Sequence, residues 1–275
     1  GMVQSLPGLL AGLAEPALGA ADAHGHGEHI AAAAMGPAFE VARHFALIPF
    51  IPLLACILCG VCAVMKVKSK LPAIMTVVAL ATSFVLTLML YFRVAPNIET
   101  SGHAIIHAFD WINYQFGADK AQTLTANFSF YVDSLTCLWM LFVTGLATLI
   151  ALYASEYMSH DLGMGYCRFF AAFGLFVFSM ACLVMGDNLV LLFLGWEGVG
   201  LCSYLLIGYF YKKPSAVAAA KKAFIMNRIG DLGLSLGVML TFVYFGTVEY
   251  QHLFPKIEQY LTLAREHKFD PVSYT

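Results

Sequence analysis

The sequence predicts an all-α polytopic membrane protein with about six transmembrane helices. Hydrophobic residues make up 60% of its 275 residues, and charged residues make up only 12%. The mean hydropathy of +0.76 is typical of a membrane protein and not of a soluble globule. Several apolar stretches also reach the roughly 20 residues that a helix needs to cross a bilayer.

Six apolar stretches are predicted to span the membrane, because each is long and mostly apolar and is bounded by a turn or by polar residues. They cover residues 45–65, 71–92, 131–154, 166–185, 188–210 and 216–245. The residue types at 123–131 are typical of strands, so we expect a short β-hairpin in the loop after the second helix. The chain thus divides into an amino-terminal extension (1–44), helices one and two (45–92), an extramembrane loop (93–130), a core of helices three to six (131–245) and a polar carboxy-terminal segment (246–275).

The distribution of basic residues predicts the orientation of these helices. Cations gather in the short loops after helices one, three and five and at the adjoining helix ends: Lys66, Lys68, Lys70, Arg168, Lys212, Lys213, Lys221 and Lys222. Short basic loops stay on the cytoplasmic side. Both termini are therefore expected on the periplasmic side of a bacterial-type inner membrane. The net charge of −2 gives no indication of a nucleic-acid partner.

Two groups of residues have side chains of the kinds that bind metals, but we predict a metal site at neither. Cys56, Cys59 and Cys62 have a spacing known from iron–sulfur ligands. However, they lie within one apolar helix, where each three-residue step turns the side chain by about 300°, so we expect them to pack as free cysteines. The histidine-rich residues 24–29 are suited to zinc or nickel, but a short tract of this kind is only a compositional hint, and we interpret it as incidental polarity.

Glu197 is the only charged residue in the fifth predicted helix. An ionised side chain at that depth costs at least about 3 kcal/mol, so it should face a bundle interior or a hydrated cavity. At about 100° per residue, Gly195, Gly198 and Cys202 form a small-residue stripe opposite Glu197 and Tyr204, and small residues let helices approach closely. Two interpretations follow: Glu197 carries protons, or it is a structural hydrogen-bonding group between helices.

The sixth predicted helix carries further charges. Arg228 and Asp231 are three residues apart and are therefore neighbours on one helix face. A mostly polar strip containing this pair follows that face, and its members are Lys221, Phe224, Asn227, Arg228, Asp231 and Ser235. The pair either neutralises itself, as intramembrane charges usually do, or adjusts the charge of Glu197. The second hypothesis requires that Glu197 and Arg228 face each other.

These motifs resemble the L-type antiporter-like subunit of respiratory complex I, called chain 5 in mitochondria. The resemblance is closest in residues 196–208 (WEGVGLCSYLLIG), and it continues in 222–224 (KAF) and 227–231 (NRIGD). Residues 133–135, 157–161 and 168–170 support it more weakly. It covers roughly residues 40 to 250, and the motif in the fifth helix separates the L-type from its sister subunits.

The resemblance implies a role for each matching residue. Glu197 corresponds to the proton-path glutamate of the family, and Arg228 with Asp231 corresponds to its intramembrane ion pair. Lys222 matches the family's lysine although the helical projection favours Lys221, so both are candidates. The accessory candidates are Asp133, His160 and Asp161. The resemblance also implies that this chain holds no cofactor, and that flavin, iron–sulfur clusters and quinone are on partner subunits.

The chain also departs from the family pattern. Family members continue with a broken seventh helix bearing a lysine, a second inverted repeat and a long lateral helix, so the chain matches only part of an antiporter-like bundle. Transporters of this kind build a midplane site from such repeats. We therefore expect either that another chain supplies the later helices, as in a split subunit, or that this sequence is a fragment. We also expect contacts to the other membrane subunits of complex I and to the bilayer.

Three functions remain open at this point. The leading hypothesis is a proton-translocating subunit, or part of a split one, of NADH:quinone oxidoreductase. A cation/proton antiporter or a bicarbonate-uptake subunit of the same family would share its acid and its ion pair. The third candidate is a non-transporting scaffold in a membrane complex. A soluble enzyme is excluded, because no nucleophile triad, phosphate loop or metal quartet is present.

Overall fold

The computed structural model describes residues 43–94, 103–116 and 122–266, and the histidine-rich residues 24–29 lie outside this part. Most of the described chain is helical, and two strands form the remaining regular structure. In chain order the elements are η2 (Arg43–Ala46), α3 (Leu47–Val64), α4 (Leu71–Val94), β1 (Ala104–Phe116), β2 (Gln122–Val132), α5 (Ser134–Tyr157), η4 (Ser159–Asp161), α6 (Met164–Met185), α7 (Leu189–Ile207), η5 (Gly208–Phe210), α8 (Pro214–Phe245) and α9 (Tyr250–Glu266).

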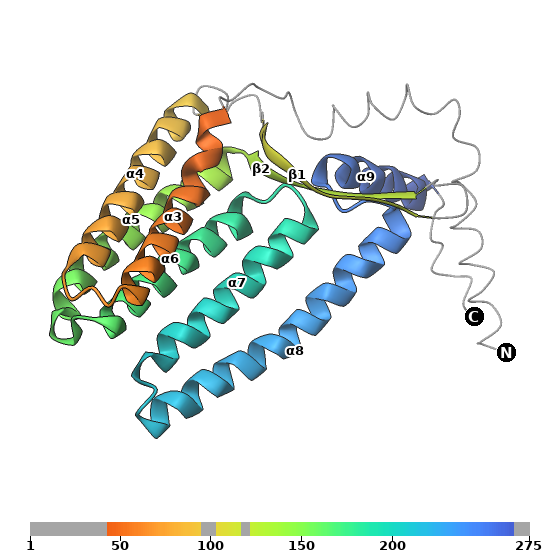
Figure 1. The fold of residues 1–275 in the computed structure, drawn as a ribbon. Coiled ribbons are helices and arrows are strands. Elements are labelled where there is room, and N and C mark those ends of the chain that lie inside the picture. Colours follow the sequence, from red (N-terminus) through yellow and green to blue (C-terminus); the bar gives the residue numbers. More distant parts are fainter. Residues whose placement is uncertain (1–42, 95–102, 117–121, 267–275) are drawn as a thin grey trace.

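Six helices are long and apolar enough to cross a membrane, which confirms the predicted fold class. Helices α3 to α6 form a bundle, α7 lies against α6, and α8 lies outside α7 (Figure 1). The strands and α9 lie at one end of the helices, and the short turns after α3, α5 and α7 lie at the other. Half of the spanning window of α6 is buried, against 6% for α8. Within the described chain, α8 therefore has an uncovered outer face.

A β-hairpin follows the second helix, as predicted, but it is longer than expected. Strand β1 pairs antiparallel with β2, with Ala104 opposite Val132 and Phe116 opposite Gln122. The predicted start of the third span at residue 131 is wrong, because residues 131 and 132 belong to β2 and α5 begins at Ser134. Hydropathy alone does not distinguish the apolar end of a strand from the start of a spanning helix.

One proline in α3 shows how the bundle satisfies a polar group in an apolar setting. Pro52 lies inside α3 and has no N–H to donate to the carbonyl of Ile48 four residues earlier. The Ser83 hydroxyl of α4 donates to that carbonyl oxygen at 3.0 Å. In a bilayer this matters, because no water is present to satisfy a free carbonyl.

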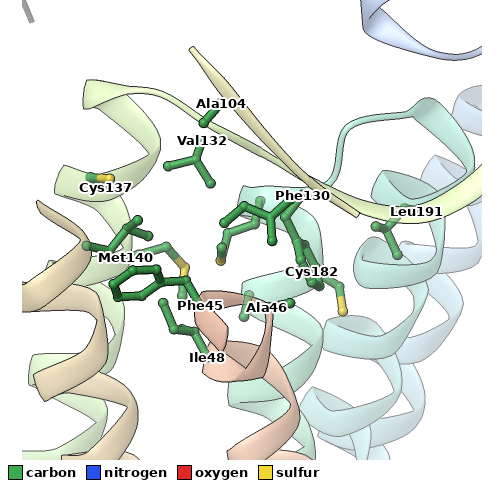
Figure 2. Packing of buried hydrophobic residues seen from close by; sticks show 14 of the residues in the cluster. Phe45, Ala46, Ile48, Ala104, Phe130, Val132, Cys137, Met140, Cys182 and Leu191 are labelled. Atoms are coloured by element: carbon green, nitrogen blue, oxygen red, sulfur yellow. The ribbon is translucent and has the colours of Figure 1, made fainter. Parts of the chain in front are cut away.

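The described helices bury two apolar clusters, one toward each end. The cluster at the hairpin end joins η2 and α3 to both strands and to α5, α6 and α7 (Figure 2). Its labelled members are Phe45, Ala46, Ile48, Ala104, Phe130, Val132, Cys137, Met140, Cys182 and Leu191. This packing fixes the hairpin to the helical bundle.

The three cysteines of α3 pack as apolar side chains. Cys59 is fully buried against α4, where its Sγ lies 3.4 Å from Thr76 Oγ1. Cys62 is also buried, and Cys56 is partly exposed. All three are free thiols in the structure.

A close approach of α6 and α7 depends on the small-residue stripe expected on α7. A Cβ atom at Gly195 would lie 2.5 Å from the backbone nitrogen of Leu183 and 2.7 Å from its Cα. At Gly198 an added Cβ would collide with the side chain of Ser179. The stripe therefore faces α6, a partner that the sequence did not specify. It leaves the opposite side of α7 for the charged residue, as predicted.

The carboxy-terminal segment contains a helix that was not predicted. Helix α8 ends at Phe245. The next residue, Gly246, caps it with a positive φ of 68°, the left-handed conformation favoured by glycine. The chain then forms α9, which is polar enough to lack the hydropathy of a spanning helix. The expectation that residues 246–275 form only a polar segment was therefore incomplete for the described part.

We predict that Gly195→Ala separates α6 from α7 and lowers stability by about 1–3 kcal/mol, the usual cost of overpacking. Thermal unfolding of the purified chain in detergent, followed by circular dichroism, would measure this loss. Gly230→Ala in α8 is the matched control, because an added Cβ there meets nothing within 4 Å. That substitution should leave stability unchanged or raise it by up to about 1 kcal/mol. Equal midpoints for the two variants would contradict the close approach.

Candidate functional site

The charged side chain of α7 meets an arginine of α8. Asn188 caps the start of α7 by accepting a hydrogen bond from the Leu191 N–H at 2.8 Å. About two turns later, Glu197 Oε2 lies 2.6 Å from Arg228 Nη1, a distance typical of a strong charge-assisted hydrogen bond. The Glu197 side chain is 22% exposed and that of Arg228 is 45% exposed. The two residues therefore face each other, as the sequence hypothesis requires.

Asp231 is the second carboxylate of this site, and it is the most buried of the three charged groups. Its side chain is 9% exposed. Its Oδ2 lies 3.6 Å from Arg228 Nη1, whereas its Oδ1 accepts a hydrogen bond from the Trp196 indole N–H at 2.8 Å. The indole, and not the guanidinium, is thus the closer donor to Asp231.

The remaining residues of the predicted strip place aromatic and amide groups beside the ion pair. The Arg228 guanidinium lies 4.6 Å from the centre of the Phe224 ring, a cation–π geometry. The Phe224 ring in turn lies 5.3 Å from that of Tyr204 on α7. Asn227 lies next to Gly200 of α7. From Phe224 to Asp231 the strip therefore faces α7.

The two candidate lysines do not join this site within the described chain. Lys221 and Lys222 are both exposed, and neither forms an ion pair with a residue that the structure describes. Lys221 lies two helical turns before Arg228, roughly 10 Å along the axis. The geometry therefore gives no preference for either lysine as a partner of Glu197.

The three accessory candidates lie elsewhere. Asp133 caps α5 at the hairpin end by accepting a hydrogen bond from the Thr136 N–H at 2.7 Å. Asp161 accepts a hydrogen bond from the Tyr209 hydroxyl at the opposite end of the bundle. His160 lies in the same turn, with its ring 6.1 Å from that of Tyr157. Tyr209 follows Glu197 by twelve residues, roughly 18 Å along a helix, so these groups are not in contact with the ion pair.

The sequence interpretation missed the role of Asp187, a buried carboxylate between α6 and α7. Its backbone N–H donates to the Ser129 carbonyl at 3.3 Å, and its carbonyl accepts from the Tyr250 N–H at 3.0 Å. Its Oδ1 accepts from the Asn188 side-chain amide at 2.6 Å. Asp187 thus connects β2, α7 and α9. An Asx residue directly before an apolar run is a helix-start signal, and it would have identified this junction.

Burial raises the pKa of Asp187 to about 6, and the nearby Glu249 charge adds to this effect. Burial also raises the pKa of Tyr250 to about 12, with a further contribution from Asp187. Asp187 is therefore easier to protonate in the folded chain than in the unfolded chain.

Two family patterns match the chain. The family described as "NADH:quinone oxidoreductase/Mrp antiporter, TM" matches residues 186–267. The family described as "NADH-Ubiquinone oxidoreductase (complex I), chain 5 N-terminus" matches residues 120–170. The first match contains Glu197, Arg228 and Asp231, and the second contains β2 and α5.

NADH-quinone oxidoreductase subunit L of Mycobacterium tuberculosis (strain ATCC 25618 / H37Rv) is 48% identical over 146 residues, which are 53% of this chain and 22% of that protein. The chain belongs to the L-type antiporter-like subunit family. A second relative of this L-type chain is the chloroplastic NAD(P)H-quinone oxidoreductase subunit 5 of Piper cenocladum. It is 36% identical over 211 residues, which are 76% of this chain and 27% of the relative. The L-type chain thus spans about a quarter of the length of these relatives.

Two solved structures share the fold of this L-type chain. The membrane-bound sulfane sulfur reductase, described as an archaeal respiratory membrane complex, matches 77% of this chain and 39% of its own, with a TM-score of 0.62 and 18% identity. The Mrp complex from Dietzia sp. DQ12-45-1b matches 75% of this chain and 20% of its own, with a TM-score of 0.55 and 20% identity. At these identities the likeness concerns the helical fold alone.

We predict that Asp187 makes this L-type chain less stable as the pH rises from about 4 to about 7. The folded pKa of about 6 lies above the unfolded value of about 3.9, so the folded state binds the proton more tightly. This contribution to stability is complete below pH 4 and is lost as the pH rises through 6. It amounts to up to about 3 kcal/mol, at 1.36 kcal/mol for each unit of pKa difference.

Thermal midpoints of the wild type and of Asp187→Asn between pH 4 and pH 8 would measure this contribution. The asparagine keeps one acceptor oxygen for Asn188 but does not titrate, so its midpoint should fall less over this range. The exposed Asp110, which pairs with His107 at 2.9 Å, provides the Asp→Asn control. If Asp187→Asn and Asp110→Asn have the same pH dependence, the proposed effect of burial is wrong.

Proposed function

We propose that this chain is a proton-translocating part of an NADH:quinone oxidoreductase. The observation that carries the proposal is the 2.6 Å contact between Glu197 and Arg228 inside two spanning helices. Isolated charges are expensive at this depth, and intramembrane ionisable groups commonly mark an ion pathway. The names of the relatives support the assignment to this enzyme.

The number of charges at the site supports proton binding. Glu197 and Asp231 are two carboxylates, and Arg228 is the one cation that lies within 4 Å of either among the described residues. With both carboxylates ionised, the three groups carry a formal charge of −1. One bound proton restores neutrality, and so does one further cation. A cation that approaches Arg228 or leaves it would therefore change whether a proton is held, which is the step that translocation needs.

The uncovered face of α8 supports further membrane partners. The exposed residues of α8 include Lys221, Lys222 and Arg228, and lipid is an unfavourable neighbour for these charges. Small residues are also present there, since an added Cβ at Gly230, Gly233 or Gly237 meets nothing within 4 Å. Small residues allow close helix packing. We therefore assign this face to later helices of the same subunit type, supplied by this chain or by another, within the membrane arm of complex I.

The proposal places the redox chemistry outside the described chain. Flavin, iron–sulfur clusters and quinone would be held by partner subunits, and this chain would respond to electron transfer through its charged residues. The end with the basic turns would face the cytoplasm. The hairpin and α9 would then lie on the periplasmic side of a bacterial-type inner membrane.

A cation/proton antiporter is the second candidate. The family pattern that covers α7, α8 and α9 is shared with Mrp antiporters, and the Mrp complex has the same fold over three quarters of this chain. Proton movement measured with and without sodium would distinguish the two functions. Co-purification with flavin-bearing subunits would favour the oxidoreductase, and sodium-dependent proton movement without them would favour the antiporter.

We predict that Glu197→Gln abolishes most proton translocation while the complex stays assembled. Glutamine keeps the shape and the hydrogen bonding of glutamate but does not titrate. Positioned acid–base groups typically contribute about 10²- to 10⁴-fold to a proton-transfer rate, so proton uptake per NADH oxidised should fall at least roughly tenfold. Quenching of a pH-sensitive dye in proteoliposomes, recorded together with NADH oxidation, would measure it.

The matched control is Glu156→Gln, also in a spanning helix. Glu156 pairs with Lys70 at 2.6 Å at the exposed basic end of the bundle, and its replacement should leave translocation unchanged. If Glu197→Gln pumps as well as this control, the chain acts as a scaffold and the proposed function is wrong.

A further inference from the structure

We propose that Trp196 is a positioning residue that directs the Arg228 charge toward Glu197 by holding Asp231 with its indole N–H. This inference rests on the proposed function and deepens it. The Trp196 Nε1 atom lies 2.8 Å from Asp231 Oδ1. The guanidinium of Arg228 lies 2.6 Å from Glu197 but 3.6 Å from Asp231.

From the helix positions alone, Arg228 would be expected to lie closer to Asp231 than to Glu197, but the two distances are in the opposite order. Arg228 and Asp231 are three residues apart on one helix, where opposite charges pair readily. Glu197 is on a different helix. Nevertheless, the Arg228–Glu197 contact has hydrogen-bonding length, and 3.6 Å is too long for a hydrogen bond. Something must therefore weaken the competition from Asp231 for the cation.

Trp196 is suited to this task for two reasons. An indole N–H can only donate, so it binds the carboxylate and cannot compete for the guanidinium. The hydrogen bond also partly satisfies a carboxylate that is 9% exposed, which lowers the cost of its burial. Asp231 can therefore remain in place without a close cation.

Trp196 and Glu197 reach α8 together because they are adjacent on α7. Gly195 packs against α6, and the next two residues are each turned by about 100° from the one before. The indole and the carboxylate thus meet successive acceptor and donor groups of the same α8 turn. Trp196 is 42% exposed, so it is not held in place as a fully buried core side chain.

The test is a double-mutant cycle on proton uptake per NADH in the reconstituted complex. Trp196→Phe keeps an aromatic ring but removes the donor, so Asp231 is free to move toward Arg228. We expect a loss of about two- to tenfold, the range given by one hydrogen bond. Trp139→Phe, on the exposed surface of α5, is the matched control and should have no effect.

The Trp196→Phe substitution in an Asp231→Asn variant distinguishes two roles of Trp196: directing the Arg228 charge toward Glu197, or only forming a structural hydrogen bond with residue 231. Asparagine can still accept from the indole but carries no charge that attracts Arg228. Trp196→Phe should therefore cause no further loss in this background. If Trp196→Phe lowers proton uptake as much in this background as in the wild type, the proposal is wrong and the hydrogen bond is only structural. The proposal is also wrong if Trp196→Phe in the wild type pumps like Trp139→Phe.

Infrared spectra keep the inference testable if Asp231→Asn alone stops pumping. The carboxylate bands of Glu197 and Asp231 are assigned by subtracting spectra of Glu197→Gln and Asp231→Asn in the full complex. Charge positioning requires that Trp196→Phe shifts both bands, whereas a local hydrogen bond shifts the Asp231 band alone. Because this readout does not depend on pumping, it separates failure of the inference from failure of the proposed function.

Discussion

The cost of placing charges in a bilayer is the constraint on which this structure depends. Within a bilayer, Glu197, Arg228 and Asp231 lie away from bulk water and salt, so their charges need compensation from other protein groups or from a hydrated cavity. The observed solution shares one guanidinium unequally between two carboxylates and adds an indole donor. Such a site is sensitive to any charge that approaches it, because the electrostatic energy at low dielectric changes steeply with distance.

The packing of α7 is a direct consequence of this constraint. Its glycine side lies so close to α6 that a methyl group would collide with the backbone of Leu183. This contact fixes the rotation of α7 about its own axis, and that rotation decides where Glu197 points. The Asp187–Asn188 junction fixes the same helix at its start, through hydrogen bonds to β2 and α9. The ion pair is therefore positioned by an apolar contact on one side and by a polar junction at one end.

The sequence was sufficient for the features that depend on one segment at a time. The six spans follow from length and hydropathy, and the facing directions of Gly195 and Glu197 follow from the helical period. Features that depend on two segments were harder to predict. Strand β1 was not located, because its partner in β2 lies across a loop and its own residues mix polar and apolar types.

The sequence prediction also missed features that leave no mark in a hydropathy profile. Helix α9 has the mixed composition of a surface segment, so nothing in a hydropathy profile marks it. The Trp196–Asp231 hydrogen bond joins residues 35 positions apart, and a tryptophan in an apolar helix is normally interpreted as packing. Lys221 projects onto the polar strip of α8, yet it is exposed, because a helical projection gives a direction but not the presence of a neighbour.

The side chain of the site that is most exposed determines which group a neighbouring subunit would contact first. Glu197 is 22% exposed and Arg228 is 45% exposed, and Arg228 belongs to α8, whose outer face is uncovered in the described chain. Protein packed against that face would therefore contact the guanidinium before it reached either carboxylate. An anionic neighbour there would draw Arg228 away from Glu197, whereas a cationic neighbour would press it closer. Under the proposed function, the arginine, and not the acid, is the group through which a neighbouring helix would change the proton occupancy of this site.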